Sequence, residues 1–189
     1  SNPTCGFNRG GAAPAITSFR CIQRLWVLGL FVLVFGGCEA ASPPPGQAID
    51  GTAGNESLSG GNGDDTIRGF DGRDTIEGGF GDDELQGWGW ADVIEGGPGS
   101  DTIGGGDGPD TLRGGAGDDR IEGGSFADLI EGDAGDDTLF GGNGADTVRG
   151  GDGADEIVGA AWGDLLQGGD GADTISGLAG NDAIDGGAG

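Results

Sequence analysis

The sequence of 189 residues contains no histidine, tyrosine or methionine, and only eight lysine and arginine residues stand against 33 aspartate and glutamate residues. Without histidine, a catalytic site cannot use imidazole as its base, and zinc or copper sites lose a preferred ligand. The formal net charge of −25 argues against nucleic acid as a partner, because phosphate groups would meet an acidic surface. These shortages favour a binding or structural role over catalysis.

Cysteines and long apolar runs are also scarce. The three cysteines, Cys5, Cys21 and Cys38, lie in the first fifth of the chain, so no disulfide framework can hold the remainder. The longest apolar run, residues 25–35, is too short to cross a bilayer comfortably. It follows three arginines in a segment without acidic residues before Glu39, a pattern typical of a secretory signal. A single transmembrane anchor is the alternative interpretation.

The apolar run ends in Gly36-Gly37-Cys38, which resembles a bacterial lipobox. This resemblance implies that Cys38 becomes the lipid-modified first residue, although Phe35 stands where the leading leucine is usual. The alternative is ordinary signal cleavage near Ala40, which would remove Cys38. A lipid on Cys38 would provide a membrane tether, and one acyl chain alone holds weakly.

Composition divides the chain into three parts. Residues 1–41 form the N-terminal segment of signal or lipoprotein type, and residues 42–50 form a proline-rich spacer. Residues 51–189 hold most of the 49 glycines and form the repeat domain. Residues 48–50 already read as the tail of a repeat, so the fold is expected to begin just before Gly51.

The repeat domain consists of fifteen tandem copies of a nine-residue unit, followed by the opening of a sixteenth. Residues 60–68 are a clean copy, Gly-Gly-Asn-Gly-Asp-Asp-Thr-Ile-Arg. In the fifteen copies the first place is always glycine, the sixth is aspartate except for Glu56, and the eighth is leucine, isoleucine or valine. The fourth place is glycine in twelve copies and Trp90, Phe126 or Trp162 in the others.

Each unit predicts a glycine-rich turn over its first six places, because glycine alone enters positive φ freely. The last three places, as in Thr66-Ile67-Arg68, predict a very short strand with its aliphatic side chain inward. One such residue cannot form a core, so the units must stack and share one.

The repeat resembles the calcium-binding nonapeptide of the RTX, or hemolysin-type, proteins, whose motif is G-G-x-G-x-D-x-U-x. The resemblance implies an all-β fold, a right-handed parallel β-roll with two units per coil. It also implies Ca²⁺ ions held between stacked turns.

With two units per coil, turns 18 residues apart stack at strand spacing, about 4.8 Å. Carboxylates about 5 Å apart repel by roughly 3 kcal/mol at an effective dielectric constant near 20, so the columns need a cation. Ca²⁺ accepts six to eight oxygen ligands, including backbone carbonyls. One predicted column of ligands is Asp65, Asp83, Asp101, Asp119, Asp137, Asp155 and Asp173, and the other is Asp74, Asp92, Asp110, Asp128, Asp146, Asp164 and Asp182.

Trp90, Phe126 and Trp162 are 36 residues apart, which places them on one edge of the roll. They are a candidate interaction ridge, and the alternative is local packing that replaces calcium in those turns. Packing is favoured, because each aromatic residue is accompanied by an apolar seventh-place residue. Since an aromatic residue replaces glycine there, we expect disturbed carbonyl ligands and weaker calcium binding on this edge.

The sequence therefore predicts a non-catalytic, calcium-dependent repeat protein outside the cell or on a bacterial surface, such as an outer-membrane lipoprotein. The alternative is a C-terminal RTX module of a larger secreted enzyme or toxin. Neither a protein nor a glycan partner is identified. A flat threonine ladder for ice or carbohydrate is interrupted, because Thr66, Thr102 and Thr138 alternate with Glu84, Arg120 and Glu156.

Overall fold

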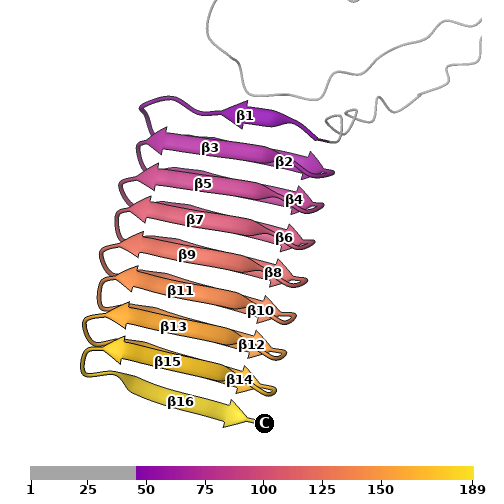
Figure 1. Cartoon of the computed structure of the whole chain (residues 1–189). Coiled ribbons are helices and arrows are strands. Elements are labelled where there is room, and N and C mark those ends of the chain that lie inside the picture. Colours follow the sequence, from indigo (N-terminus) through magenta and orange to yellow (C-terminus); the bar gives the residue numbers. More distant parts are fainter. Residues whose placement is uncertain (1–45) are drawn as a thin grey trace, which may run out of the picture. The chain divides into compact units, whose positions relative to one another are not determined.

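The computed structural model describes residues 46–189, and every regular element in this range is a β-strand (Figure 1). This part of the chain therefore contains no helix long and apolar enough to cross a membrane. The strands are β1 (Ala48–Asp50), β2 (Ser57–Asn62), β3 (Thr66–Asp71), β4 (Thr75–Phe80), β5 (Glu84–Gly89), β6 (Val93–Pro98), β7 (Thr102–Asp107), β8 (Thr111–Ala116), β9 (Arg120–Ser125), β10 (Leu129–Ala134), β11 (Thr138–Asn143), β12 (Thr147–Asp152), β13 (Glu156–Ala161), β14 (Leu165–Asp170), β15 (Thr174–Ala179) and β16 (Ala183–Ala188).

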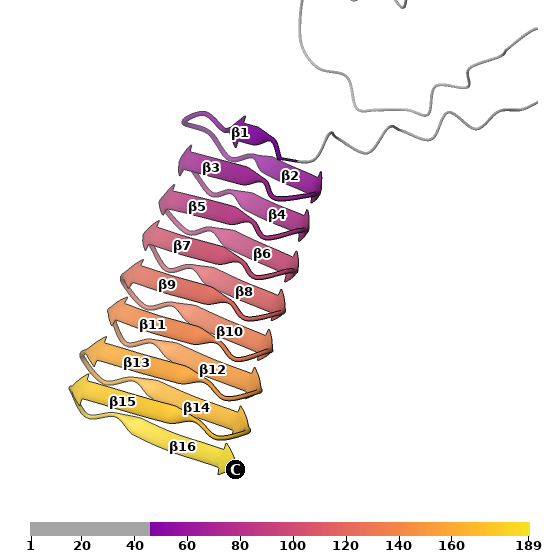
Figure 2. The same ribbon diagram turned by 45° about the vertical axis from the view of Figure 1, so that its right-hand side comes forward.

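The strands wind as a flattened coil with two strands in each turn of the coil (Figures 1 and 2). The odd-numbered strands form one eight-stranded sheet, the odd sheet, and the even-numbered strands form the other, the even sheet. All pairs are parallel, and each residue pairs with the residue 18 positions further on, as Thr66 does with Glu84. The predicted all-β parallel β-roll with two units per coil is confirmed.

The strands are longer than the three residues that the sequence predicts, and every strand from β2 to β16 has six. Each strand joins places seven to nine of one unit to places one to three of the next, as in Thr66–Asp71. The first glycines of the motif were therefore wrongly assigned to the turn. The second-place glycines take positive φ, as Gly79 does, yet the parallel ladder continues across this place, from Phe70 to Trp88 for example.

Strands at both ends of the roll extend beyond the fifteen complete repeats. Strand β1 covers residues 48–50, as the repeat-like tail before Gly51 suggested. Strand β16 includes residues 186–188, for which no strand was expected. The incomplete last unit still pairs with β14, because parallel pairing needs only backbone groups.

The core is a double row of single aliphatic side chains, one from each unit. The eighth-place residues are fully buried from Ile67 to Leu166 and stack in register along each sheet. Ile49, Leu58 and Ile175 pack against the ends of this row. Because inward and outward residues alternate along a strand, the first-place glycine also faces the interior. The interior is therefore narrow, because of the two inward places in each strand one holds an aliphatic side chain and the other holds a glycine.

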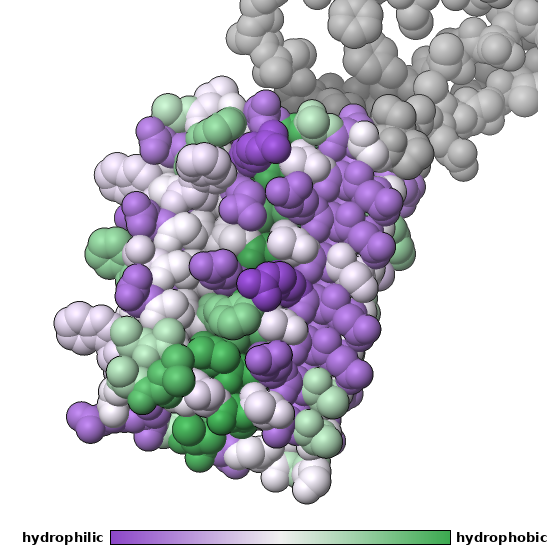
Figure 3. All heavy atoms as spheres, viewed as in Figure 1, coloured by the Kyte–Doolittle hydropathy of each residue, from purple (hydrophilic) through white to green (hydrophobic). Residues whose placement is uncertain are grey.

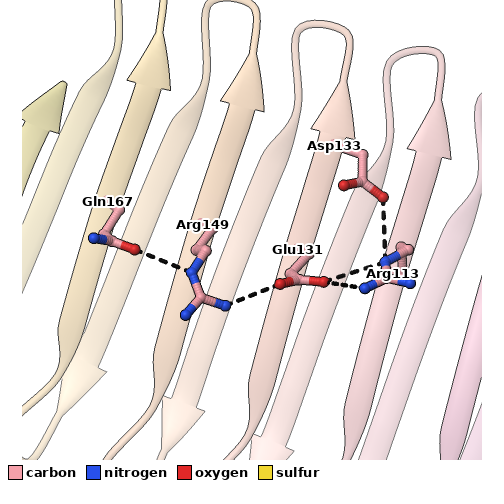
Figure 4. A network of polar contacts seen from close by, with 5 residues as sticks. All are labelled: Arg113, Glu131, Asp133, Arg149 and Gln167. Carbon is pink, nitrogen blue, oxygen red and sulfur yellow. Dashed lines mark hydrogen bonds and ion pairs between the residues drawn. The ribbon is translucent and has the colours of Figure 1, made fainter. Parts of the chain in front are cut away.

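A chain of charged groups crosses the outer face of the even sheet (Figure 4). Glu131 accepts a hydrogen bond from Arg149 at 2.9 Å and is also paired with Arg113, while Arg149 donates to Gln167 at 3.0 Å. The hydrogen bond from Arg113 is the main cause that lowers the pKa of Glu131. These residues occupy the ninth place of successive coils, so opposite charges meet across strands and support the register.

Candidate metal-binding turns

From β2 onward the turns between strands have only three residues each, and the sixth-place aspartate is the last of them. Turns that follow even strands form one edge of the roll, which we call the Asp65 edge, and those that follow odd strands form the Asp74 edge. On both edges the aspartates stack 18 residues apart, as the repeat predicts. Each aspartate thus sits at the start of the strand that follows it.

One carboxylate oxygen of each stacked aspartate belongs to a hydrogen-bonded ladder. The backbone N–H of Asp65 donates to Oδ1 of Asp83 at 2.7 Å, and the N–H of Asp83 donates to Oδ1 of Asp101 at 2.8 Å. The same contact recurs on the other edge, from the N–H of Asp74 to Oδ1 of Asp92 at 2.8 Å. The ladder links each turn to the next coil and explains why a side-chain oxygen is required at this place.

The second carboxylate oxygen, Oδ2, is buried and has no hydrogen-bond partner. This holds for Asp65, Asp74, Asp83, Asp92, Asp101, Asp110, Asp119, Asp128, Asp137, Asp146, Asp155, Asp164 and Asp173. A buried oxygen without a partner is costly, and each one in a native structure requires an explanation such as an ion. The repetition of this defect in every central turn indicates a common ligand.

The unpartnered oxygen lies above the first-place glycine of its own unit. A Cβ added to Gly114 would collide with Oδ2 of Asp119 and would lie 2.8 Å from the carbonyl oxygen of Gly132. The open inward position left by the glycine is thus occupied by the aspartate side chain. This contact accounts for glycine at the first place of all fifteen units.

Backbone carbonyls supply further oxygens along both edges. A Cβ added to Gly99 would collide with the carbonyl oxygen of Gly81, and one added to Gly97 would collide with that of Gly79. The carbonyls at the second and fourth places therefore point along the stack toward the next turn. Most of these places hold glycine, so in most coils no side chain separates the carbonyl oxygens of successive turns.

Burial raises the pKa of the aspartates in the central coils. It raises the pKa of Asp110, Asp119 and Asp128 to about 7, against the effect of the hydrogen bond from the preceding turn. Neighbouring aspartates raise the pKa further, as Asp137 and Asp101 do for Asp119. The columns thus carry negative charge at neutral pH only at a free-energy cost, which a bound cation would offset.

These residues fit a hard cation that takes oxygen ligands. No three His, Cys, Asp or Glu side chains within residues 46–189 gather into a metal-sized group. A cation between two turns would therefore combine the sixth-place carboxylates with glycine carbonyls, a donor set of the kind that Ca²⁺ accepts. In such a site the buried Oδ2 atoms would provide the charge, and backbone carbonyl oxygens of adjacent turns would provide the remaining ligands.

Comparison with known families agrees with this geometry. The profile of the RTX calcium-binding nonapeptide repeat matches the chain in four copies, at residues 50–85, 95–130, 122–157 and 163–189, about two thirds of its length. The chain belongs to the RTX calcium-binding nonapeptide repeat family. None of the curated proteins compared with the chain matches it. The RTX repeat is a structural calcium-binding motif, and its turns in this chain are those just described.

The sequence-predicted residues fall into three groups in the RTX roll. The fourteen aspartates are brought together in the two predicted columns, and Asp173 and Asp182 lie in the last, less buried turns. Trp90, Phe126 and Trp162 lie on the Asp74 edge, as expected from their spacing. Cys38 lies outside the described residues.

Local packing of the three aromatic residues is not what the structure shows. Trp90, Phe126 and Trp162 are 64%, 63% and 70% exposed, so their rings are not buried against the roll. Their φ values of 81 to 84° are left-handed like those of the glycines that they replace. A Cβ at Gly108 would collide with the carbonyl oxygen of Trp90, so the aromatic turns still direct this carbonyl toward the next turn. The carbonyl oxygens of Phe126 and Trp162 likewise lie where a Cβ at Gly144 and at Gly180 would be.

Sequence reasoning missed the hydrogen-bonding role of the fifth-place aspartates. On the Asp65 edge, Oδ1 of Asp118 accepts a hydrogen bond from the N–H of Asp136 at 2.9 Å, and Asp64 and Asp82 make the same contact with the next coil. The doublets Asp64-Asp65, Asp82-Asp83, Asp118-Asp119 and Asp136-Asp137 were visible in the sequence. Their separate roles were not, because one member is exposed and the other is buried.

Proposed function

We propose that this chain is a non-catalytic extracellular protein whose RTX roll folds only when Ca²⁺ binds between the stacked turns on both edges. The observation that carries the proposal is the row of buried, unpartnered Oδ2 atoms. Each proposed site combines the sixth-place aspartates of successive turns with backbone carbonyls of the adjacent glycines. The proposed ligands are the fourteen aspartates from Asp65 to Asp182 at nine-residue intervals.

The proposed folding requirement follows from the balance between a small core and a large negative charge. Each unit contributes one aliphatic side chain to the core, and the chain carries a net charge of −25. A ligand that binds the folded chain alone stabilises it by mass action. Calcium would compensate the buried carboxylates and link adjacent coils at the same time.

Circular dichroism tests this requirement. In excess EGTA the chain is expected to lack strand signal, and millimolar Ca²⁺ should restore it cooperatively because each site joins neighbouring coils. Equal strand content in EGTA and in calcium would contradict the proposal.

Two variants separate the cation from the hydrogen-bonded ladder. Asp119→Asn keeps an oxygen to accept the N–H of Asp101 but replaces the charged Oδ2, so it should raise the calcium concentration needed for folding. Asp152→Asn removes the same charge from an exposed third-place residue and is the matched control. An equal shift in the two variants would mean that total charge, rather than the buried site, sets the calcium requirement.

We further propose that residues 1–41 direct export and that Cys38 carries a lipid which holds the protein at a bacterial surface. Support comes from the apolar run before Gly36-Gly37-Cys38 and from the calcium-binding repeats, which are typical of secreted proteins.

Expression in a Gram-negative host tests the lipid. The wild-type chain should fractionate with membranes, whereas Cys38→Ser should be soluble or unprocessed, because it lacks the thiol that is acylated. Identical fractionation of the two chains would favour ordinary signal cleavage instead.

A further inference from the structure

Three aromatic side chains project from the Asp74 edge although the fold gains no burial from them. Trp90, Phe126 and Trp162 are all more than 60% exposed. Each holds a left-handed φ, which costs a residue other than glycine free energy and is a feature of functional sites. Glycine fills the same place in twelve of fifteen units, so the fold itself does not require these rings.

The rings alternate with polar side chains along the edge. The third-place residues in the coils before Trp90, Phe126 and Trp162 are Asp71, Asp107 and Asn143, and all three are exposed. In the aromatic coils themselves this place holds the small residues Gly89, Ser125 and Ala161. Ring and hydrogen-bonding group thus share one 36-residue period, in alternate coils. At strand spacing, successive rings are about 9.6 Å apart.

A hollow of about 410 Å³ lies between the first two rings. It is lined by Trp90 and Phe126, by the carboxylates Asp71 and Asp107, and by Gly108 and Pro109 on the intervening turn. Gly108 has no side chain, so none stands between the two rings. Hollows of this volume are in the range that holds small ligands.

We propose that the Asp74 edge binds an extended, uncharged glycan of β-linked pyranose rings, with alternate sugars stacked on Trp90, Phe126 and Trp162. A pyranose ring presents an apolar C–H face to an aromatic ring and a rim of hydroxyl groups to carboxylates and amides. The alternation of rings with Asp71, Asp107 and Asn143 matches both parts of such a chain. Neighbouring sugars of a β-1,4-linked glycan face opposite ways, so like faces recur at every second sugar.

Charge and shape narrow the choice of partner. Polyanions are disfavoured by Asp71 and Asp107 and by the net charge of −25. The partner does not need a positive charge, because the place that Asp107 holds between the first two rings is held by neutral Asn143 between Phe126 and Trp162. A flat protein interface needs a broad contiguous patch, whereas these three rings form a single row of separate side chains. The Asp65 edge has glycine at every fourth place and is hydrophilic, seen as the purple band on the right of Figure 3.

Isothermal titration calorimetry tests the proposal with two neutral probes, cellohexaose and the hexamer of N-acetylglucosamine, added to the calcium-loaded chain. Hexagalacturonate is the charged probe and should bind more weakly, because Asp71 and Asp107 disfavour polyanions. The wild-type chain should bind at least one neutral hexamer. The double variant Trp90→Gly/Phe126→Gly should bind it at least about tenfold more weakly, as expected for loss of aromatic stacking. Trp90→Phe should retain binding.

The glycine variants restore the residue found in the other turns, so they should fold as well as the wild type by circular dichroism. Phe80→Ala is the matched control, because Phe80 is 63% exposed but belongs to β4 on the even sheet. Its affinity should equal that of the wild type. Failure of both neutral hexamers to bind, unchanged affinity in the double variant, or an equal loss in Phe80→Ala would overturn the proposal. Folding and calcium binding are measured separately, so failure of the calcium proposal would be distinguishable.

Discussion

At the scale of the residue, each repeat is held by a contact between its first-place glycine and its sixth-place aspartate. The sixth-place aspartate reaches back over the first-place glycine, as Asp119 does over Gly114, and leaves one oxygen buried without a partner. The other oxygen holds the previous turn by a hydrogen bond to its backbone. Glycine and aspartate recur together because the aspartate side chain occupies the space where any other residue at the first place would have its Cβ.

Gly114→Ala is therefore expected to lower the free energy of unfolding by about 1–3 kcal/mol or more, as overpacking does. The new Cβ would meet Asp119 and the carbonyl oxygen of Gly132. Gly186→Ala is the matched control, because Gly186 holds the same place in the repeat and nothing lies within 4 Å of its added Cβ. Chemical denaturation in saturating calcium measures both variants, and equal stability would contradict the contact.

At the scale of the element, the two edges have the same backbone architecture and different surfaces. Both have stacked aspartates with a buried Oδ2 and carbonyls directed along the stack. The Asp65 edge adds fifth-place aspartates that accept backbone hydrogen bonds, whereas the Asp74 edge adds the exposed rings. The aromatic residues adopt left-handed φ and keep their carbonyls directed toward the next turn, so they change the surface of this edge while its aspartates stay stacked.

Asp119→Ala on the Asp65 edge and Asp128→Ala on the Asp74 edge should therefore weaken calcium-driven folding to a similar extent. Both aspartates are buried, accept one backbone hydrogen bond and have a pKa raised to about 7 by burial. Calcium titrations followed by circular dichroism compare them. A clearly larger effect of Asp119→Ala would support the interpretation drawn from the sequence, in which the aromatic turns bind calcium weakly.

At the scale of the whole molecule, the described roll encloses two columns of carboxylates beside a thin aliphatic core. Burial raises the pKa to about 6 for Asp92, Asp101 and Asp137, and to about 7 for Asp110, Asp119 and Asp128. The largest shifts lie in the central coils, which are covered on both sides. Protons and calcium therefore compete for the same buried oxygens.

In the calcium-free chain, the free energy of unfolding should fall as the pH rises from about 4 to about 7, and should then level off. In this interval the folded chain retains protons on Asp110, Asp119 and Asp128, whereas unfolded aspartates, with a pKa near 3.8, have released theirs. Circular dichroism in calcium-free buffer across this pH range follows folding, with strand signal expected near pH 4 and lost toward pH 7. Asp119→Asn removes one such proton and should make the slope shallower, and stability that increases with pH would contradict the assignment.

The sequence by itself determined the repeat, the two columns of aspartates, the double row of core residues and the edge on which the aromatic residues lie. These follow from the nine-residue period together with the two units per coil that the RTX resemblance implies, because the two fix which residues stack at a separation of 18. The predicted β-roll and its register needed no information from distant parts of the chain beyond this repetition.

The tertiary structure decided the strand length, the burial of the carboxylates and the exposure of the aromatic rings. Glycines that read as a turn continue the strand, because neighbouring coils supply hydrogen bonds across them. The sixth-place aspartates are buried, because the first-place glycine opens space beneath them. Trp90 is exposed and holds a left-handed φ, neither of which its spacing in the sequence shows. Each of these depends on neighbours one coil away, which a single unit does not contain.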